Sequence, residues 1–295
     1  MKSPYIFLVA SAILFGAVIG LSKFFADLGF SNFEIGFYSL VFSVLFLLPI
    51  ILFKRELMIK KDMIKFFAVY GLILAFLHLT QFLGVVLGVP VAIVALLLYS
   101  QPIWTTIFGK FFLKEEITKR KIQAVAIALI GVILVVKPWD IQSAGPILGI
   151  ASSLLAGIAL SLWVIFGRMA AIRKQHFVTM LFGRQIFAVL WLLLFWIISY
   201  PFVKDISLFR LSANFPADQW IYFALYTLFA FTISNLMFNI GIQKIQSSTA
   251  GIVLLIEPVS AAILAALLFA EPITSNVILG GALILFSNYF IMKEK

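Results

Sequence analysis

The sequence contains no cysteine and very little charge. The absence of cysteine excludes disulfide bonds and thiolate chemistry. Only 12% of the 295 residues are charged, whereas 63% are hydrophobic; an average soluble domain has about 25% charged residues. A soluble protein has no core large enough for so many apolar side chains, but a membrane protein exposes them to lipid. The composition therefore indicates an integral membrane protein without a sizeable hydrophilic domain.

Other missing features narrow the possible classes of function. No glycine-rich loop ends in Lys-Ser or Lys-Thr, so nucleotide-driven pumping by this chain alone is not expected. The apolar stretches also lack clustered acids, histidines or metal ligands, and hold one deep glutamate, Glu257, and one histidine, His78. We therefore expect no enzymatic activity, no metal and no cofactor. The net charge of +10 does not indicate nucleic-acid binding, because no basic domain with a recognisable motif is present.

Ten stretches are long and apolar enough to cross a bilayer, which takes about 20 residues as a helix. They lack the alternating pattern of barrel strands, so we interpret them as helices. The predicted class is an all-α integral membrane protein with ten transmembrane helices. The spans lie near residues 4–24, 34–53, 66–84, 91–112, 121–137, 147–167, 177–201, 219–241, 248–269 and 274–292.

The basic residues fall mainly in one set of loops. If the N-terminus is internal and the spans alternate, sixteen lysines and arginines lie inside, and only Lys23, Lys137, Lys204 and Arg210 lie outside. This bias predicts that both termini are cytoplasmic and that the basic loops contact anionic lipid head groups. Residues 1–24 have a weak basic region and a long apolar run, so we interpret them as the first span rather than a cleaved signal.

A pattern in the fourth span returns in the ninth. Gln101-Pro102 in the first half corresponds to Glu257-Pro258 in the second. The same offset in residue number relates Glu115, Ile117 and Thr118 to Glu271, Ile273 and Thr274. Such self-similarity indicates duplication. Each half holds five spans, an odd number, so the second half enters the membrane in the opposite orientation. We predict two inverted five-helix repeats, residues 1–140 and 141–295, as in many secondary transporters.

Glu257 is the residue whose position is hardest to explain by packing alone. It lies near the middle of the ninth span, where an ionisable group is costly and faces a cavity or a partner. The following Pro258, like Pro102 after Gln101, removes a backbone donor and predicts a helix kink. Three roles stay open for Glu257: a proton-coupling carboxylate, a ligand for a substrate ammonium group, or a structural partner of Arg184 or of the freed backbone.

Arg184 and His78 each have two interpretations. Arg184, beside Gln185 in an otherwise apolar span, could pair a substrate carboxylate bidentately, but its place in the inner half of the span allows it to reach the cytoplasmic surface. His78 could change charge near neutral pH, or it could be a neutral, hydrogen-bonded core residue.

Several further polar or aromatic side chains either tie helices together or contact a ligand. His78 and Gln81 share one helix face, as do Asn235 and Asn239. Trp163 lies near the end of its span, where an interface anchor is the commoner role. We interpret Glu115 and Glu271 as helix-end partners. The candidates for substrate binding or coupling are Glu257, Gln101, His78, Gln81, Tyr99, Asn235, Asn239, Arg184 and Trp163.

These features resemble the EamA-type transporters of the drug/metabolite transporter superfamily. The resemblance rests on the two five-helix halves, the paired proline motifs, the Leu-Ile-Glu-Pro run at 255–258 and Gly16 with Lys23. It implies a ten-helix bundle, alternating access, a bacterial inner membrane and export of amino acids or other small metabolites. One position departs from the family: Tyr38-Ser39 stand where an arginine is common, and Arg184 has the corresponding place in the second half.

The predicted function is secondary active transport, with export of amino acids or related small organic metabolites by alternating access. Proton coupling is one option for its energy source. A facilitative uniporter or channel, with Glu257 in its selectivity site, is the alternative. The expected partners are a small-molecule substrate and the lipid bilayer. Spans five and ten hold few polar groups, which suits a lipid-facing perimeter or a dimer contact, so the protein is a monomer or a homodimer.

Overall fold

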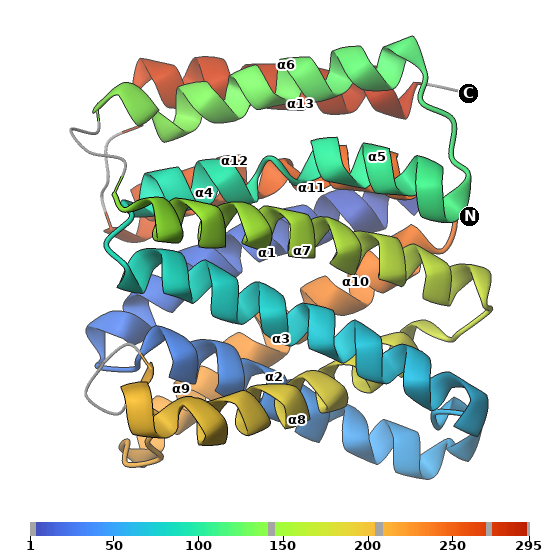
Figure 1. Cartoon of the computed structure of the whole chain (residues 1–295), viewed down its shortest axis with the longest axis vertical. Coiled ribbons are helices and arrows are strands. Elements are labelled where there is room, and N and C mark those ends of the chain that lie inside the picture. The colour runs from blue at the N-terminus through green and yellow to red at the C-terminus, as the bar shows by residue number, and fades with distance from the viewer. Residues whose placement is uncertain (1–3, 141–144, 204–208, 270–272, 294–295) are drawn as a thin grey trace.

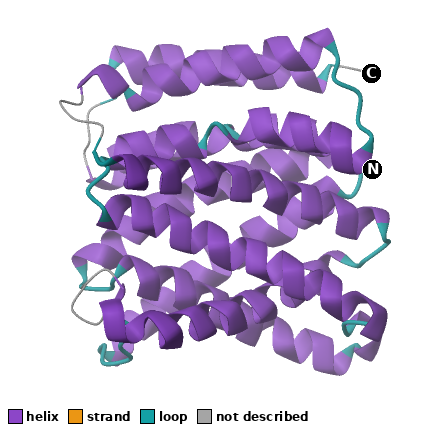
Figure 2. Ribbon diagram, in the orientation of Figure 1, coloured by secondary structure: helices purple, strands orange, loops and turns teal. Residues whose placement is uncertain are grey.

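A computed structural model describes residues 4–140, 145–203, 209–269 and 273–293. Within these ranges the chain is helical and has no strand (Figure 2). Ten helical spans are long and apolar enough to cross a membrane, and they coincide with the predicted ones. The protein is thus a multi-pass membrane protein, as expected. Glu271 lies outside the described residues.

Six helices form the first five spans, and eight helical segments, seven α-helices and one π-helix, form the second five. The first set is α1 (Pro4–Asp27), α2 (Asn32–Phe53), α3 (Ile64–Val86), α4 (Val91–Leu98), α5 (Gln101–Leu113) and α6 (Lys119–Val136). The second set is α7 (Ile147–Ile172), α8 (Phe177–Val203), α9 (Ala217–Tyr226), the π-helix η5 (Thr227–Thr232), α10 (Ile233–Ile242), α11 (Ser247–Leu254), α12 (Ile256–Phe269) and α13 (Ser275–Met292). Short 3-10 turns η1 (Arg55–Leu57), η2 (Lys61–Met63) and η3 (Pro138–Asp140) lie in the connections.

Local sequence explains where several helices begin. Ser31 and Glu34 form a capping box at α2, because the serine hydroxyl accepts from the Glu34 N–H and the glutamate accepts from the Ser31 N–H. Thr118 caps α6, because its hydroxyl oxygen accepts a hydrogen bond from the Lys121 N–H. At α8, Nδ1 of His176 accepts from the Val178 N–H at 3.3 Å. Burial, with Lys54 nearby, lowers the pKa of His176, which keeps its imidazole neutral and able to accept.

The fourth and ninth spans are interrupted just before their prolines. α4 ends at Leu98 and α5 begins at Gln101, while α11 ends at Leu254 and α12 begins at Ile256. Proline has no N–H to donate to the preceding turn, and its ring crowds the carbonyl four residues earlier, so the helix is weakened at both places. The breaks lie at Tyr99-Ser100 and Leu255, next to Gln101 and Glu257.

The helices stack in layers that run across the view of Figure 1. α6 and α13 form the outermost layer and pack on each other at two glycines: a Cβ at Gly131 would lie 2.7 Å from the Gly280 carbonyl oxygen. This agrees with the perimeter role expected for spans five and ten. In the interior, α1 packs on α10 and α12, α3 on α7 and α8, and α5 on α7 and α11.

Both chain ends lie at the same end of the bundle, as an even number of spans requires (Figure 1). We call this the terminal end; it carries the connections at 54–63, 114–118, 173–176 and 243–246. The opposite, far end carries the connections at 28–31 and 87–90 and the described residues 137–140, 145–146 and 209–216.

Candidate substrate site

Arg184 of α8 is fully buried inside the bundle. Its Nη1 donates to the Tyr70 hydroxyl of α3 at 3.1 Å and to Oδ1 of Asn239 at 3.0 Å. Its Nη2 donates to Oδ1 of Asn235. The two asparagines, four residues apart on α10, therefore present their amide oxygens to one guanidinium. Arg184 does not reach the surface, so the interpretation that it extends to the cytoplasmic face is wrong.

Backbone hydrogen bonds orient both asparagine side chains so that their amide oxygens face Arg184. Nδ2 of Asn235 donates to the Phe231 carbonyl at 2.8 Å, and Nδ2 of Asn239 donates to the Phe177 carbonyl at 3.0 Å. With each amide nitrogen committed to a backbone oxygen, each amide oxygen must face the guanidinium.

Aromatic rings cover the Arg184 guanidinium. Its central carbon lies 4.8 Å from the Trp163 ring centroid and 5.5 Å from that of Tyr70. Trp163 of α7 stacks on Phe238 at 4.2 Å and meets the edge of Phe15 of α1 at 6.2 Å. Trp163 is thus an interior residue and not a membrane-interface anchor. The rings screen the cation from lipid and contribute cation–π attraction.

The Arg184 site lacks a negative charge. Among the described residues Arg184 makes no ion pair, and its Nε–H is buried without a hydrogen-bond partner. A desolvated cation surrounded by neutral oxygens retains an unsatisfied attraction for an anion. A carboxylate is the natural complement, because it accepts two parallel guanidinium hydrogen bonds.

Glu257 occupies a separate position at the start of α12. It is partly buried, and the Tyr99 hydroxyl donates to its Oε1 at a long 3.4 Å. No ion pair to Glu257 is formed within the described ranges, so it is not the structural partner of Arg184 that the sequence allowed. Within the described ranges, Arg184 and Glu257 therefore do not neutralise each other.

The remaining candidates are Gln101, His78 and Gln81. Gln101 is buried beside Thr105, to which its Nε2 donates at 2.5 Å, and it lies against Gly251 of α11. His78 and Gln81 lie farther along α3 than Tyr70, toward the far end. Gln185, next to Arg184, is fully buried with both amide atoms unpartnered within the described ranges.

At the terminal end a carboxylate joins the two halves of the chain. Glu115, after α5, accepts hydrogen bonds from the N–H and hydroxyl of Ser247 at 2.6 and 2.8 Å, and from those of Ser248 at 3.0 and 2.6 Å. It thereby caps the N-terminus of α11, where a negative charge is favourable. The prediction that Glu115 is a helix-end partner is confirmed. We call this contact the Glu115 latch.

At the far end a second carboxylate, which sequence reasoning missed, joins the two halves of the chain. Glu34 is fully buried, pairs with Arg210 at 3.3 Å, and accepts from the Ser212 N–H at 2.7 Å. The sequence did contain a signal for the role of Glu34, because Ser31 and Glu34 have the spacing of a capping box. Tyr70 was also missed, but no local pattern distinguishes it from the other aromatic residues of the spans.

Comparisons with known proteins agree with this architecture. A model of the EamA-like transporter family matches residues 2–137 and again residues 147–293. An uncharacterized transporter of Archaeoglobus fulgidus is 27% identical over 86% of this chain and 85% of its own length, and a second one is 24% identical over 97% and 95%. An uncharacterized transporter of Clostridium kluyveri is 23% identical over 95% and 90%. One solved crystal structure aligns with 96% of this chain and 94% of its own, with a TM-score of 0.76 at 15% identity, so the two share a fold.

Proposed function

Because the chain belongs to the EamA-like transporter family, we propose that it is a secondary active transporter that exports amino acids or related small carboxylates from the cytoplasm. The observation that carries this proposal is Arg184: a fully buried guanidinium with neutral partners and an unpartnered Nε–H. A protein gains nothing from a buried cation in this state unless something anionic offsets it part of the time. A substrate carboxylate that binds and leaves meets that requirement.

Glu257 is proposed as the coupling group. Its carboxylate has one long hydrogen bond, from Tyr99, and no cation among the described contacts. A proton or a substrate ammonium group can therefore associate with it without displacing an existing partner. Because Glu257 adjoins the break between α11 and α12, a change in its charge acts where the helix is already interrupted.

Alternating access is proposed to break, in turn, the contacts that join the two halves at each end of the bundle: the Glu115 latch at the terminal end and the Glu34–Arg210 pair at the far end. The terminal end is taken as cytoplasmic because the basic loops lie there, and the Glu115 latch must then open before substrate enters from that side. The two halves are proposed to be inverted repeats. One pair of contacts supports this: the start of α2 binds the 210–212 segment at the far end, and Thr179 near the start of α8 donates to the Leu57 carbonyl at the terminal end.

The test is uptake of a labelled panel of amino acids and other carboxylates into inside-out vesicles, with and without an imposed pH gradient. Saturable, gradient-dependent accumulation of a carboxylate supports a proton-coupled exporter. Saturable exchange that ignores the gradient would instead indicate a facilitator and remove the coupling role of Glu257. Transport of cations or neutral solutes with no carboxylate would contradict the assignment of Arg184.

A further inference from the structure

A shallow hollow of about 280 Å³ lies between the C-terminal ends of α5 and α7, at the terminal end of the bundle. Two of its lining side chains are cationic, four are apolar, and none is acidic. The lining residues are Phe112, Leu113, Lys114, Met169, Ile172 and Arg173.

The charge in this hollow is not neutralised by the protein. Lys114 and Arg173 are exposed and form no ion pair among the described residues. Arg173 lies over the Phe66 ring at 4.4 Å, which orients its guanidinium but leaves its charge uncompensated.

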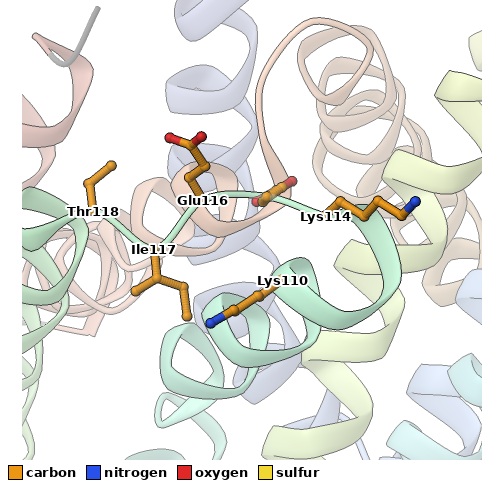
Figure 3. Close-up of a pocket in the computed structure, with 6 residues that line it drawn as sticks. Lys110, Lys114, Glu116, Ile117 and Thr118 are labelled. Atoms are coloured by element: carbon orange, nitrogen blue, oxygen red, sulfur yellow. The ribbon is translucent and has the colours of Figure 1, made fainter.

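The nearby acidic residues are directed elsewhere. Glu115 is committed to Ser247 and Ser248. Glu116 lines a larger neighbouring hollow of about 530 Å³, which Lys114 and Glu115 also line. Figure 3 shows the side chains of Glu116 and Lys114 extending in different directions from the segment between α5 and α6. Lys114 points toward the yellow-green ribbon of α7.

The rim of the hollow is strongly apolar. Phe111, Phe112 and Ile172 are 75%, 56% and 55% exposed. In a spanning bundle such side chains at a helix end face lipid acyl chains, while cations on the same turn lie at the level of the head groups. A soluble anion would use the two cations but not the apolar wall, whereas a zwitterionic lipid would use the wall but offer no net negative charge.

We propose that this hollow binds one anionic phospholipid, with its phosphate between Lys114 and Arg173 and an acyl chain along Phe112 and Ile172. The bound lipid joins the ends of α5 and α7. Because Lys114 directly precedes Glu115, it also restrains the residue that forms the Glu115 latch. This inference does not depend on which solute the protein carries.

The test is native mass spectrometry of the detergent-purified full chain titrated with phosphatidylglycerol. The variant is Lys114→Ala with Arg173→Ala. The matched control is Lys61→Ala with Lys65→Ala, which removes the same charge from exposed positions at the same end of the bundle. We expect one tightly retained lipid in the unmodified protein and in the control, and binding roughly 10- to 30-fold weaker in the variant, as expected for two cations near a head group.

Three results would overturn the proposal. Equal weakening in the control would show that only net charge matters. Equal retention of phosphatidylcholine would show that the cations do not select the lipid. Displacement by glycerol phosphate at a comparable concentration would show an anion site that needs no acyl chain. As a second variant, Phe112→Ala changes an exposed side chain only, and loss of lipid without any change in the unfolding temperature would support the proposed apolar contact.

Discussion

Arg184 and Glu257 are both ionisable residues in the membrane-spanning bundle, but the protein surrounds them differently. Arg184 is fully buried and donates three hydrogen bonds to oxygens on two other helices, beneath a layer of aromatic rings. Glu257 is only partly buried and receives one hydrogen bond of 3.4 Å. Arg184 is rigidly held, whereas Glu257 has few contacts that oppose a change in its charge or position.

This difference suggests a division of roles: Arg184 is the anchor that orients the substrate, and Glu257 is the switch that exchanges a proton. A rigidly held cation is suited to orient a carboxylate, because its donors are fixed before the substrate arrives. A loosely held acid at a helix break is suited to exchange a proton, because few interactions are lost when its charge changes. The predictions below test that division.

The largest effect is expected for Glu257→Gln. The amide keeps the size and polarity of the side chain but cannot take up a proton, so gradient-driven accumulation should fall to the level seen without a gradient, while substrate exchange continues. Accumulation and counterflow measured in the same vesicles check this. If both activities are lost together, Glu257 is required for binding or folding and is not the switch.

Arg184→Lys should reduce transport at low substrate concentration by roughly 30-fold or more, equivalent to about 2 kcal/mol of lost interaction. Lysine keeps the charge but cannot reproduce the planar fork that contacts Asn235, Asn239 and a carboxylate together. The initial rate at several substrate concentrations is the measurement. The matched control is Arg55→Lys at an exposed position, where the rate should be unchanged; normal transport by Arg184→Lys would remove the anchor role.

Breaking the Glu115 latch should expose the interior from the terminal end. The chain lacks cysteine, so Ala250→Cys, buried in α11, introduces a single thiol. Adding Glu115→Gln should raise the rate of thiol labelling from that side about tenfold, as expected for one or two lost charge-assisted hydrogen bonds. Glu116→Gln is the control, because Glu116 is exposed. Equal labelling rates in the two variants would show that Glu115 does not hold this end closed.

The two tyrosines should change stability rather than the transport cycle. Tyr70→Phe removes a 3.1 Å hydrogen bond to a buried cation and should lower the free energy of unfolding by about 1.5–3 kcal/mol. Tyr99→Phe removes the 3.4 Å contact to Glu257 and should cost less than about 1 kcal/mol. Thermal unfolding of both variants in the same detergent gives the comparison, and the reverse order would contradict the contrast between a rigid and a loose site.

Local composition and spacing were enough to predict the membrane class, the ten spans and the placement of Glu115 at a helix end. A span is recognised by apolar length, a cap by Ser or Thr with its spacing, and a helix break by proline. Each of these signals is contained within about 25 consecutive residues. That is why the spans could be predicted from the printed sequence, and why the Ser31–Glu34 signal was also available there, whereas the partners of Glu115, which lie 132 and 133 positions away, could not be identified.

The partners of the buried charges were decided only by tertiary structure. Tyr70 and Arg184 lie 114 positions apart, and Glu34 and Arg210 lie 176 apart. Which of many apolar helices meet, and at what rotation, depends on the packing of the whole bundle. The sequence by itself therefore identified Arg184 and Glu257 as the costly residues, but only the packing of α3, α7, α8 and α10 placed Arg184 among neutral oxygens and left Glu257 apart from it.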